Sequence, residues 1–138
     1  MWDRVPRSLK RKGKFMEIEI LKQRFAVCKI KDSREINFDN EFLFVGKTDE
    51  ELSVVCVEET VYKSAYAVDK GWRALRIKGV LDFYLVGILY KISKILAENN
   101  IGIFAVSTYN TDYILVKEEN INKASEKLAE NGYKILKQ

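Results

Sequence analysis

Two short segments of the chain carry residues whose types and spacing could do chemistry. The first is the stretch 79–87, which leads into a predicted helix. A helix N-terminus offers unpaired backbone N–H groups and a partial positive charge, so it can hold a carboxylate. Gly87 would let a ligand approach the backbone closely. The alternative is structural, with Asp82 as the helix cap and Phe83 in the core, and capping alone explains Asp82.

The second segment is the polar run 107–112, which lies between two apolar runs. The carboxylate of Asp112 could pair with an ammonium group, and the hydroxyl groups before it could bond a ligand head group. The alternative is an ordinary hairpin turn, for which these residue types are also typical. The residues alone leave both readings open.

Catalytic motifs are missing from the sequence. No phosphate-binding loop, dinucleotide fingerprint or nucleophile elbow occurs, and the chain has no histidine, the commonest general base. The acidic residues fall in turns, at strand ends and at a helix start, where solvation and the helix dipole explain them. We therefore expect a protein that is not an enzyme and that needs no cofactor.

The two cysteines, Cys28 and Cys56, lie in strand-like apolar runs and have no CxxC partner. Zinc would need at least three protein ligands, usually Cys or His, so a zinc site is not expected. Core thiols are expected rather than nucleophiles, and they suit a reducing cytoplasm better than a disulfide scaffold. No run of 18 apolar residues and no signal peptide pattern occurs, so we expect a cytoplasmic chain.

The C-terminal half predicts the elements that would position both segments. Residues 72–78 alternate as a strand does, and the polar run 107–112 separates two further strands, 101–108 and 113–117. Between the first two strands, six apolar residues recur with helical spacing and form one face. They are Leu85, Ile88, Leu89, Ile92, Ile95 and Leu96.

A second predicted helix follows the third strand, with Asn120 or Glu119 as its cap and Asn131-Gly132 as its end. Its apolar face consists of Ile121, Ala124 and Leu128. Residues 133–136 predict a last strand. The order β-α-β-β-α-β is that of the ferredoxin-like motif.

The N-terminal half is a weaker copy of this pattern. Residues 25–30, 42–45 and 52–57 predict strands, and the segment 45–55 aligns without gaps on 106–116. Only about ten residues separate the first two strands, which is roughly the room for one short helix and its ends. We therefore expect an abbreviated first module.

Charge is concentrated at the N-terminus. Residues 1–15 hold six basic residues and one acidic residue, which leaves 18 basic and 19 acidic residues in the rest of the chain. The domain itself is nearly neutral, so neither nucleic-acid nor membrane binding is expected. The tail is a mis-assigned start before Met16, a disordered extension or a functional arm, and these alternatives stay open.

The C-terminal half resembles the ACT domain. Residues 87–103 are similar to the ACT signature of a loop glycine, an apolar pair, an amphipathic helix and a following strand. Residues 71–76, 79–83 and 107–116 resemble the CASTOR-type ACT family, which is related to the regulatory domains of aspartate kinases. The resemblance covers roughly residues 16–136. It implies two packed ACT-like modules, with an amino acid bound between modules or between subunits.

The resemblance also implies which residues bind the ligand. The ligand carboxylate would meet backbone N–H groups near residues 83–87, and its ammonium group would meet Asp112. The expected ligand-binding residues are Asp82, Phe83, Leu85, Val86, Gly87, Ile103, Phe104, Thr108, Tyr109, Thr111 and Asp112.

We therefore expect an α+β protein of two ferredoxin-like ACT modules, with antiparallel sheets and with helices on one face. Residues 16–70 would form the abbreviated module and residues 71–138 the complete one. The expected function is regulatory binding of a free amino acid, without catalysis. The alternative is a protein-interaction or dimerisation module that binds no ligand. A homodimer is expected because open sheet edges need cover.

Overall fold

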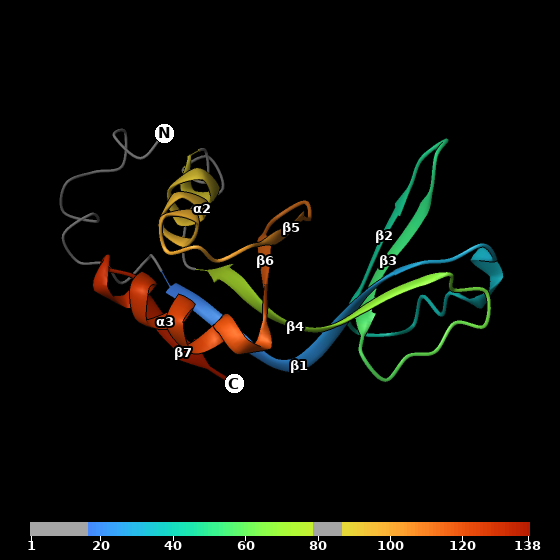
Figure 1. Ribbon diagram of the computed structural model, residues 1–138, viewed down its shortest axis with the longest axis horizontal. Coiled ribbons are helices and arrows are strands. Elements are labelled where there is room, and N and C mark those ends of the chain that lie inside the picture. Colours follow the sequence, from blue (N-terminus) through green and yellow to red (C-terminus); the bar gives the residue numbers. More distant parts are fainter. Residues whose placement is uncertain (1–16, 79–86) are drawn as a thin grey trace. The chain divides into compact units, whose positions relative to one another are not determined.

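The computed structural model describes residues 17–78 and 87–138, which form two compact units (Figure 1). Among the described residues, unit 1 contains 17–22 and 73–138, and unit 2 contains 23–72. The predicted tail 1–15 and the predicted ligand-binding residues Asp82, Phe83, Leu85 and Val86 lie outside the described residues.

Unit 1 has the predicted order of elements. The second half of strand β4 (Ala67–Lys78) is followed by helix α2 (Ile88–Glu98) and by strands β5 (Phe104–Ser107) and β6 (Asp112–Lys117). A 3₁₀ turn, η4 (Glu118–Asn120), leads into helix α3 (Ile121–Glu130), and strand β7 (Lys134–Lys137) ends the chain. Asn120 is the N-cap of α3, and Gly132 follows its C-cap with φ of 93°, as a helix end prefers.

The sheet of unit 1 contains one strand that the ferredoxin-like motif does not. Strand β1 (Glu17–Lys29) pairs in parallel with β7, from Glu17 opposite Lys134 to Ile20 opposite Lys137, and its other neighbour within unit 1 is β4. The last strand of the module therefore pairs with β1 and not with β4. Within unit 1 the strand order is β7-β1-β4-β6-β5.

The core of unit 1 forms on one face of this sheet. Alternate strand residues Ile18, Ile20, Leu75, Ile77, Ile114 and Val116 pack with the helix residues Ile88, Ile92, Leu96, Ile121, Ala124 and Leu128. All six helix residues were predicted for the faces of α2 and α3. Of the others predicted, Leu89 and Ile95 are partly buried against this core, and Leu85 lies outside the described residues. Each fully buried isoleucine or leucine stabilises the fold by roughly 1.5–3 kcal/mol. The mixed α+β class with mainly antiparallel pairing, and helices on one face, is confirmed.

Unit 2 is a small sheet with very little helix. Strands β2 (Leu43–Lys47) and β3 (Leu52–Val57) form an antiparallel hairpin, and β3 pairs with the second half of β1. The first half of β4 completes the unit. Residues between β1 and β2 contain a single 3₁₀ turn, η2 (Ser33–Glu35), instead of a helix. The buried cluster comprises Ala26, Cys28, Ile30, Ile36, Val54, Cys56 and Tyr62.

The division into units differs from the predicted modules 16–70 and 71–138. The boundary at Trp72–Arg73 lies close to the predicted one, but residues 17–22 belong with the C-terminal unit. The reason is the length of β1, whose 13 residues supply one segment to each unit. Its first segment buries Ile18 and Ile20 in the core of unit 1, and its second segment buries Ala26 and Cys28 in that of unit 2.

Candidate functional site

The β5–β6 hairpin holds the second chemical segment in a defined shape. Its strands pair antiparallel from Phe104 opposite Leu115 to Ser107 opposite Asp112. Across the four-residue turn, the Thr108 N–H donates to the Thr111 carbonyl at 2.8 Å, and the Thr108 Oγ1 donates to the same carbonyl at 3.0 Å. Neither of these two hydrogen bonds involves the side chain of Asp112.

Asp112 lies on the helix-covered face of the unit 1 sheet. Side chains alternate along a strand, so Asp112 shares a face with Ile114 and Val116, which pack against α2 and α3. Asp112 as a residue is half-buried, and its Oδ1 accepts a hydrogen bond from the Ser107 Oγ at 2.6 Å, on the exposed side of the hairpin end. Within residues 17–78 and 87–138, Asp112 forms no ion pair.

The contacts between β4 and β6 show which end of the sheet Asp112 occupies. The Arg76 guanidinium lies 6.0 Å from the centre of the Tyr113 ring, and Arg73 pairs with Glu118 at 3.4 Å. The residue number on the β4 side of these contacts falls from 76 to 73, while the number of the partner rises from 113 to 118. Strand β6 therefore runs antiparallel to β4. Asp112 therefore lies at the end of the sheet where β4 finishes at Lys78 and the chain leads into α2.

The N-terminus of α2 is the other predicted half of the site. Gly87 is the N-cap, with φ of 89°, a left-handed conformation that suits glycine. No side chain caps the first turn within the described part of the chain, so the N–H groups there have no side-chain acceptor. The structural alternative assigned the cap to Asp82, which lies outside the described residues, as does Phe83.

The other predicted ligand-binding residues fall in three environments. Thr108, Tyr109 and Thr111 lie in the β5–β6 turn beside Asp112, with the Tyr109 side chain fully exposed. Ile103 packs against the core of unit 1. Phe104 lies opposite Leu115, on the sheet face away from Asp112, so the structure does not bring Phe104 together with that carboxylate.

The two hairpins of the chain have the same turn, but the repeat is one residue out of register with the predicted alignment. Lys47 lies opposite Leu52 just as Ser107 lies opposite Asp112, and each pair is joined by four residues. The Thr48 N–H donates to the Glu51 carbonyl at 2.9 Å, which matches Thr108 and Thr111. The equivalent of residue 47 is therefore 107, whereas the alignment of 45–55 on 106–116 made it 108.

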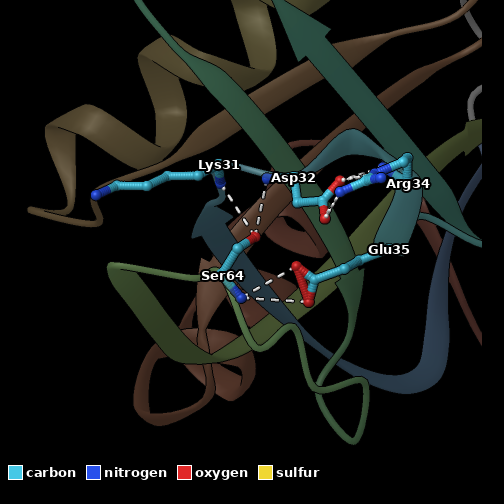
Figure 2. Close-up of polar contacts among 5 residues, drawn as sticks. All are labelled: Lys31, Asp32, Arg34, Glu35 and Ser64. Carbon is cyan, nitrogen blue, oxygen red and sulfur yellow. Dashed lines mark hydrogen bonds and ion pairs between the residues drawn. The ribbon is translucent and has the colours of Figure 1, made fainter.

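A polar cluster in unit 2 was not singled out from the sequence. The Ser64 Oγ accepts hydrogen bonds from the N–H groups of Lys31 and Asp32 at 3.2 and 2.9 Å (Figure 2). The Ser64 N–H donates to both oxygens of Glu35, at 3.2 and 3.0 Å, and hydrogen bonding by Ser64 lowers the pKa of that carboxyl. Asp32 forms a two-bond ion pair with Arg34.

This cluster, which we call the Ser64 clasp, joins the loop after β1 to the loop before β4. Lys31, Asp32 and Glu35 come from the first loop and Ser64 from the second. The Ser64 Oγ, the Ser64 N–H and the carboxylates of Asp32 and Glu35 each have a partner inside it, which is the pattern of a structural contact. No spacing rule connects residues about thirty positions apart, so no sequence signal could have found it.

The cysteines and the acidic residues offer no further chemistry in the described residues. Cys28 and Cys56 are free and buried, as expected. Burial raises the pKa of both thiols, that of Cys56 to about 12, so neither is a thiolate near neutral pH. No group of three Cys, Asp or Glu residues in this part of the chain could hold a metal ion. None of its helices is long and apolar enough to cross a membrane.

Comparison with protein families gives two matches. Residues 67–130 match the sequence model of the ACT domain, and residues 23–64 match that of an N-terminal domain. The second match begins where unit 2 begins and lies wholly within it. No curated protein sequence matches the chain.

Solved structures share the fold over most of the chain. A protein from Agobacterium tumefaciens is 29% identical with a TM-score of 0.77, over 89% of this chain and 93% of its own. A Vibrio cholerae protein described as a possible transport protein is 21% identical with a TM-score of 0.64, over 89% and 94%.

The regulatory subunit of aspartate kinase from Thermus thermophilus, in its ligand-free form, has a TM-score of 0.61 over 82% of this chain and 94% of its own. Its identity of 9% shows a shared fold alone. Residues 67–130 are therefore similar in sequence to the ACT domain, and the chain shares a fold with this regulatory subunit.

Proposed function

We propose that the chain is a regulatory protein that binds a free amino acid and catalyses no reaction. One observation carries the proposal: Asp112 lies half-buried on the helix-covered face, at the sheet end that leads into α2, without an ion pair among the described residues. A carboxylate in that position suits a cation supplied from outside the chain.

The proposed binding mode uses both ends of an amino acid. The ligand ammonium group pairs with Asp112, and the ligand carboxylate is proposed to meet backbone N–H groups near residues 83–87, which precede α2 in the sequence. A helix N-terminus favours an anion through its free N–H groups and its dipole. The Thr108, Tyr109 and Thr111 side chains, in the turn beside Asp112, are proposed to contact the rest of the ligand.

The regulatory part of the proposal rests on the fold shared with aspartate kinase regulatory domains. Binding would favour one arrangement of the protein over another, and a partner protein would respond to that arrangement. The membership of the CASTOR-type ACT family belongs to the same proposal. Its support is the resemblance of residues 71–76, 79–83 and 107–116 to that family.

The test is thermal unfolding of the purified protein with each of the twenty amino acids at millimolar concentration. An amino acid present at about 100 times its Kd should add about 2.7 kcal/mol to the stability of the native state. This corresponds to a rise of several degrees in the melting temperature. Stabilisation by one or two amino acids supports the proposal, and a flat response to all twenty contradicts it.

A second candidate function is protein interaction or dimerisation without a ligand. Exposed large apolar side chains favour it, since five of the seven in the described residues lie in unit 2: Phe38, Val45, Val61, Tyr66 and Val68. Under this proposal the chain is a homodimer with unit 2 at the interface. Sedimentation equilibrium should give twice the monomer mass, and Val61→Asp should return the protein to a monomer.

A further inference from the structure

Ser107 has one side-chain partner among the described residues, and that partner is the carboxylate proposed to bind the ligand. Its Oγ donates to the Asp112 Oδ1 at 2.6 Å, a short bond typical of a hydroxyl on a charged acceptor. We propose that Ser107 is a positioning residue that holds the Asp112 carboxylate ready for the ammonium group of an amino acid. This inference rests on the proposed function.

The hairpin does not need this hydrogen bond for its own structure. The β2–β3 hairpin closes an equivalent four-residue turn with the same threonine backbone bond, yet it has Lys47 and Leu52 where the β5–β6 hairpin has Ser107 and Asp112. The chain therefore contains its own comparison for this pair. A serine and an aspartate that the turn does not require are available for another role.

The chemistry of the pair suits an ammonium group. The serine donates its only proton to Oδ1, which leaves Oδ2 without a hydrogen bond in the part of the chain that the structure describes. The Ser107 oxygen keeps its lone pairs, so an ammonium group with three N–H donors can bond to both residues. A carboxylate already held in one orientation loses less conformational freedom on binding.

The experiment measures binding of the amino acid that stabilises the wild type most, and of its des-amino analogue, by isothermal titration calorimetry. We expect Asp112→Asn to raise the Kd for the amino acid about 100-fold and Ser107→Ala to raise it about five- to tenfold. Neither variant should weaken binding of the des-amino analogue, because that analogue has no ammonium group. Ser107→Thr keeps the hydroxyl and should restore binding.

The matched control is Ser53→Ala. The Ser53 Oγ donates to the Glu51 Oε1 at 2.9 Å in the other hairpin, so this variant also removes a serine–carboxylate bond. It should bind the amino acid as the wild type does.

Three outcomes separate the positioning role from its alternatives. If Ser107→Ala binds the amino acid normally while Asp112→Asn does not, the positioning role is wrong and the proposed function stands. If Ser107→Ala weakens binding of the amino acid and binding of its des-amino analogue equally, the role of Ser107 is structural. If none of the twenty amino acids stabilises the wild type, both proposals are wrong.

Discussion

Two carboxylates of unit 1, Glu19 and Asp112, have opposite surroundings. The Glu19 Oε1 accepts hydrogen bonds from Arg76 at 2.7 and 2.9 Å, Lys78 lies 3.8 Å away, and Gln138 bonds the other oxygen at 3.4 Å. The partner of Asp112 in the described residues is one hydroxyl group. Protein cations neutralise Glu19, so its role is structural, whereas Asp112 forms no ion pair among the described residues and is the carboxylate proposed to bind a ligand.

The first prediction concerns Glu19. Hydrogen bonding from Arg76 lowers the pKa of this carboxyl below its ordinary value of 4.5, and only 16% of its side chain is exposed. Glu19→Gln should lower the free energy of unfolding at neutral pH by about 1 kcal/mol, since it weakens a hydrogen-bonded ion pair with a partly exposed arginine. Urea unfolding of both proteins measures the difference.

The pH dependence of this difference follows from the direction of the shift. A lowered pKa in the folded state means that the stabilisation is complete above 4.5 and disappears as the pH falls through the folded-state value. The two proteins should therefore approach equal stability as the pH falls below the folded-state pKa of Glu19. Glu126→Gln removes the same charge from an exposed position and is the control. A difference that does not shrink in acid contradicts the assignment.

At the scale of elements, unit 2 has two loops at the place where a helix would pack in a complete module. The loop after β1 contains one 3₁₀ turn with no buried residue, so it cannot be held by a helical apolar face. The Ser64 clasp holds it instead, through two backbone donors and one carboxylate. Buried Ile36 and Tyr62, one in each loop, complete the attachment to the core.

The second prediction follows from the clasp. Ser64→Ala removes the shared acceptor of the Lys31 and Asp32 N–H groups, so these amides should open more often. Hydrogen–deuterium exchange of the Asp32 amide should become about tenfold faster, which is the effect of losing about one good hydrogen bond.

Ser33 provides the control for this measurement, because it lies in the same loop and is exposed. Ser33→Ala should leave exchange of the Asp32 amide unchanged. Equal exchange in Ser64→Ala and the wild type would mean that the clasp does not hold the loop.

At the scale of the whole molecule, the two units share two strands. Strands β1 and β4 both cross from one unit to the other along the chain. Unfolding of either unit would disorder parts of β1 and β4, and both strands also contribute to the other unit. We therefore expect the units to unfold together in one transition.

The third prediction tests this coupling. Ile92 is fully buried in the core of unit 1, and Ile92→Ala should cost about 2–5 kcal/mol. Circular dichroism follows α2 and α3 of unit 1, and Trp72 fluorescence, in a Trp2→Phe background, follows unit 2. Both signals should shift to lower temperature by the same amount.

The reciprocal variant is Val54→Ala, which opens the core of unit 2. It should also lower both midpoints together. Separate midpoints in either variant would show that the units unfold independently.

Sequence by itself determined the type and the buried face of most elements. The helical spacing of Ile88, Ile92 and Leu96 predicted the face of α2, and the residues from Leu52 to Val57 were predicted as the strand that the structure contains. These features are local, because each depends on side chains a few residues apart on one element. The polar turn with Asp112 was found for the same reason.

Only the tertiary structure decided which strands are neighbours. Strand β7 has backbone donors and acceptors that β1 and β4 could satisfy equally well, so its own residues do not select a partner. Packing of Ile18 and Ile20 into the core of unit 1 places β1 between β7 and β4, and the pairing of β1 with β7 joins residues over a hundred positions apart. The Ser107–Asp112 pair depends on strand register, which side-chain alternation alone does not specify. The Ser64 clasp depends on the approach of two loops about thirty residues apart in the sequence.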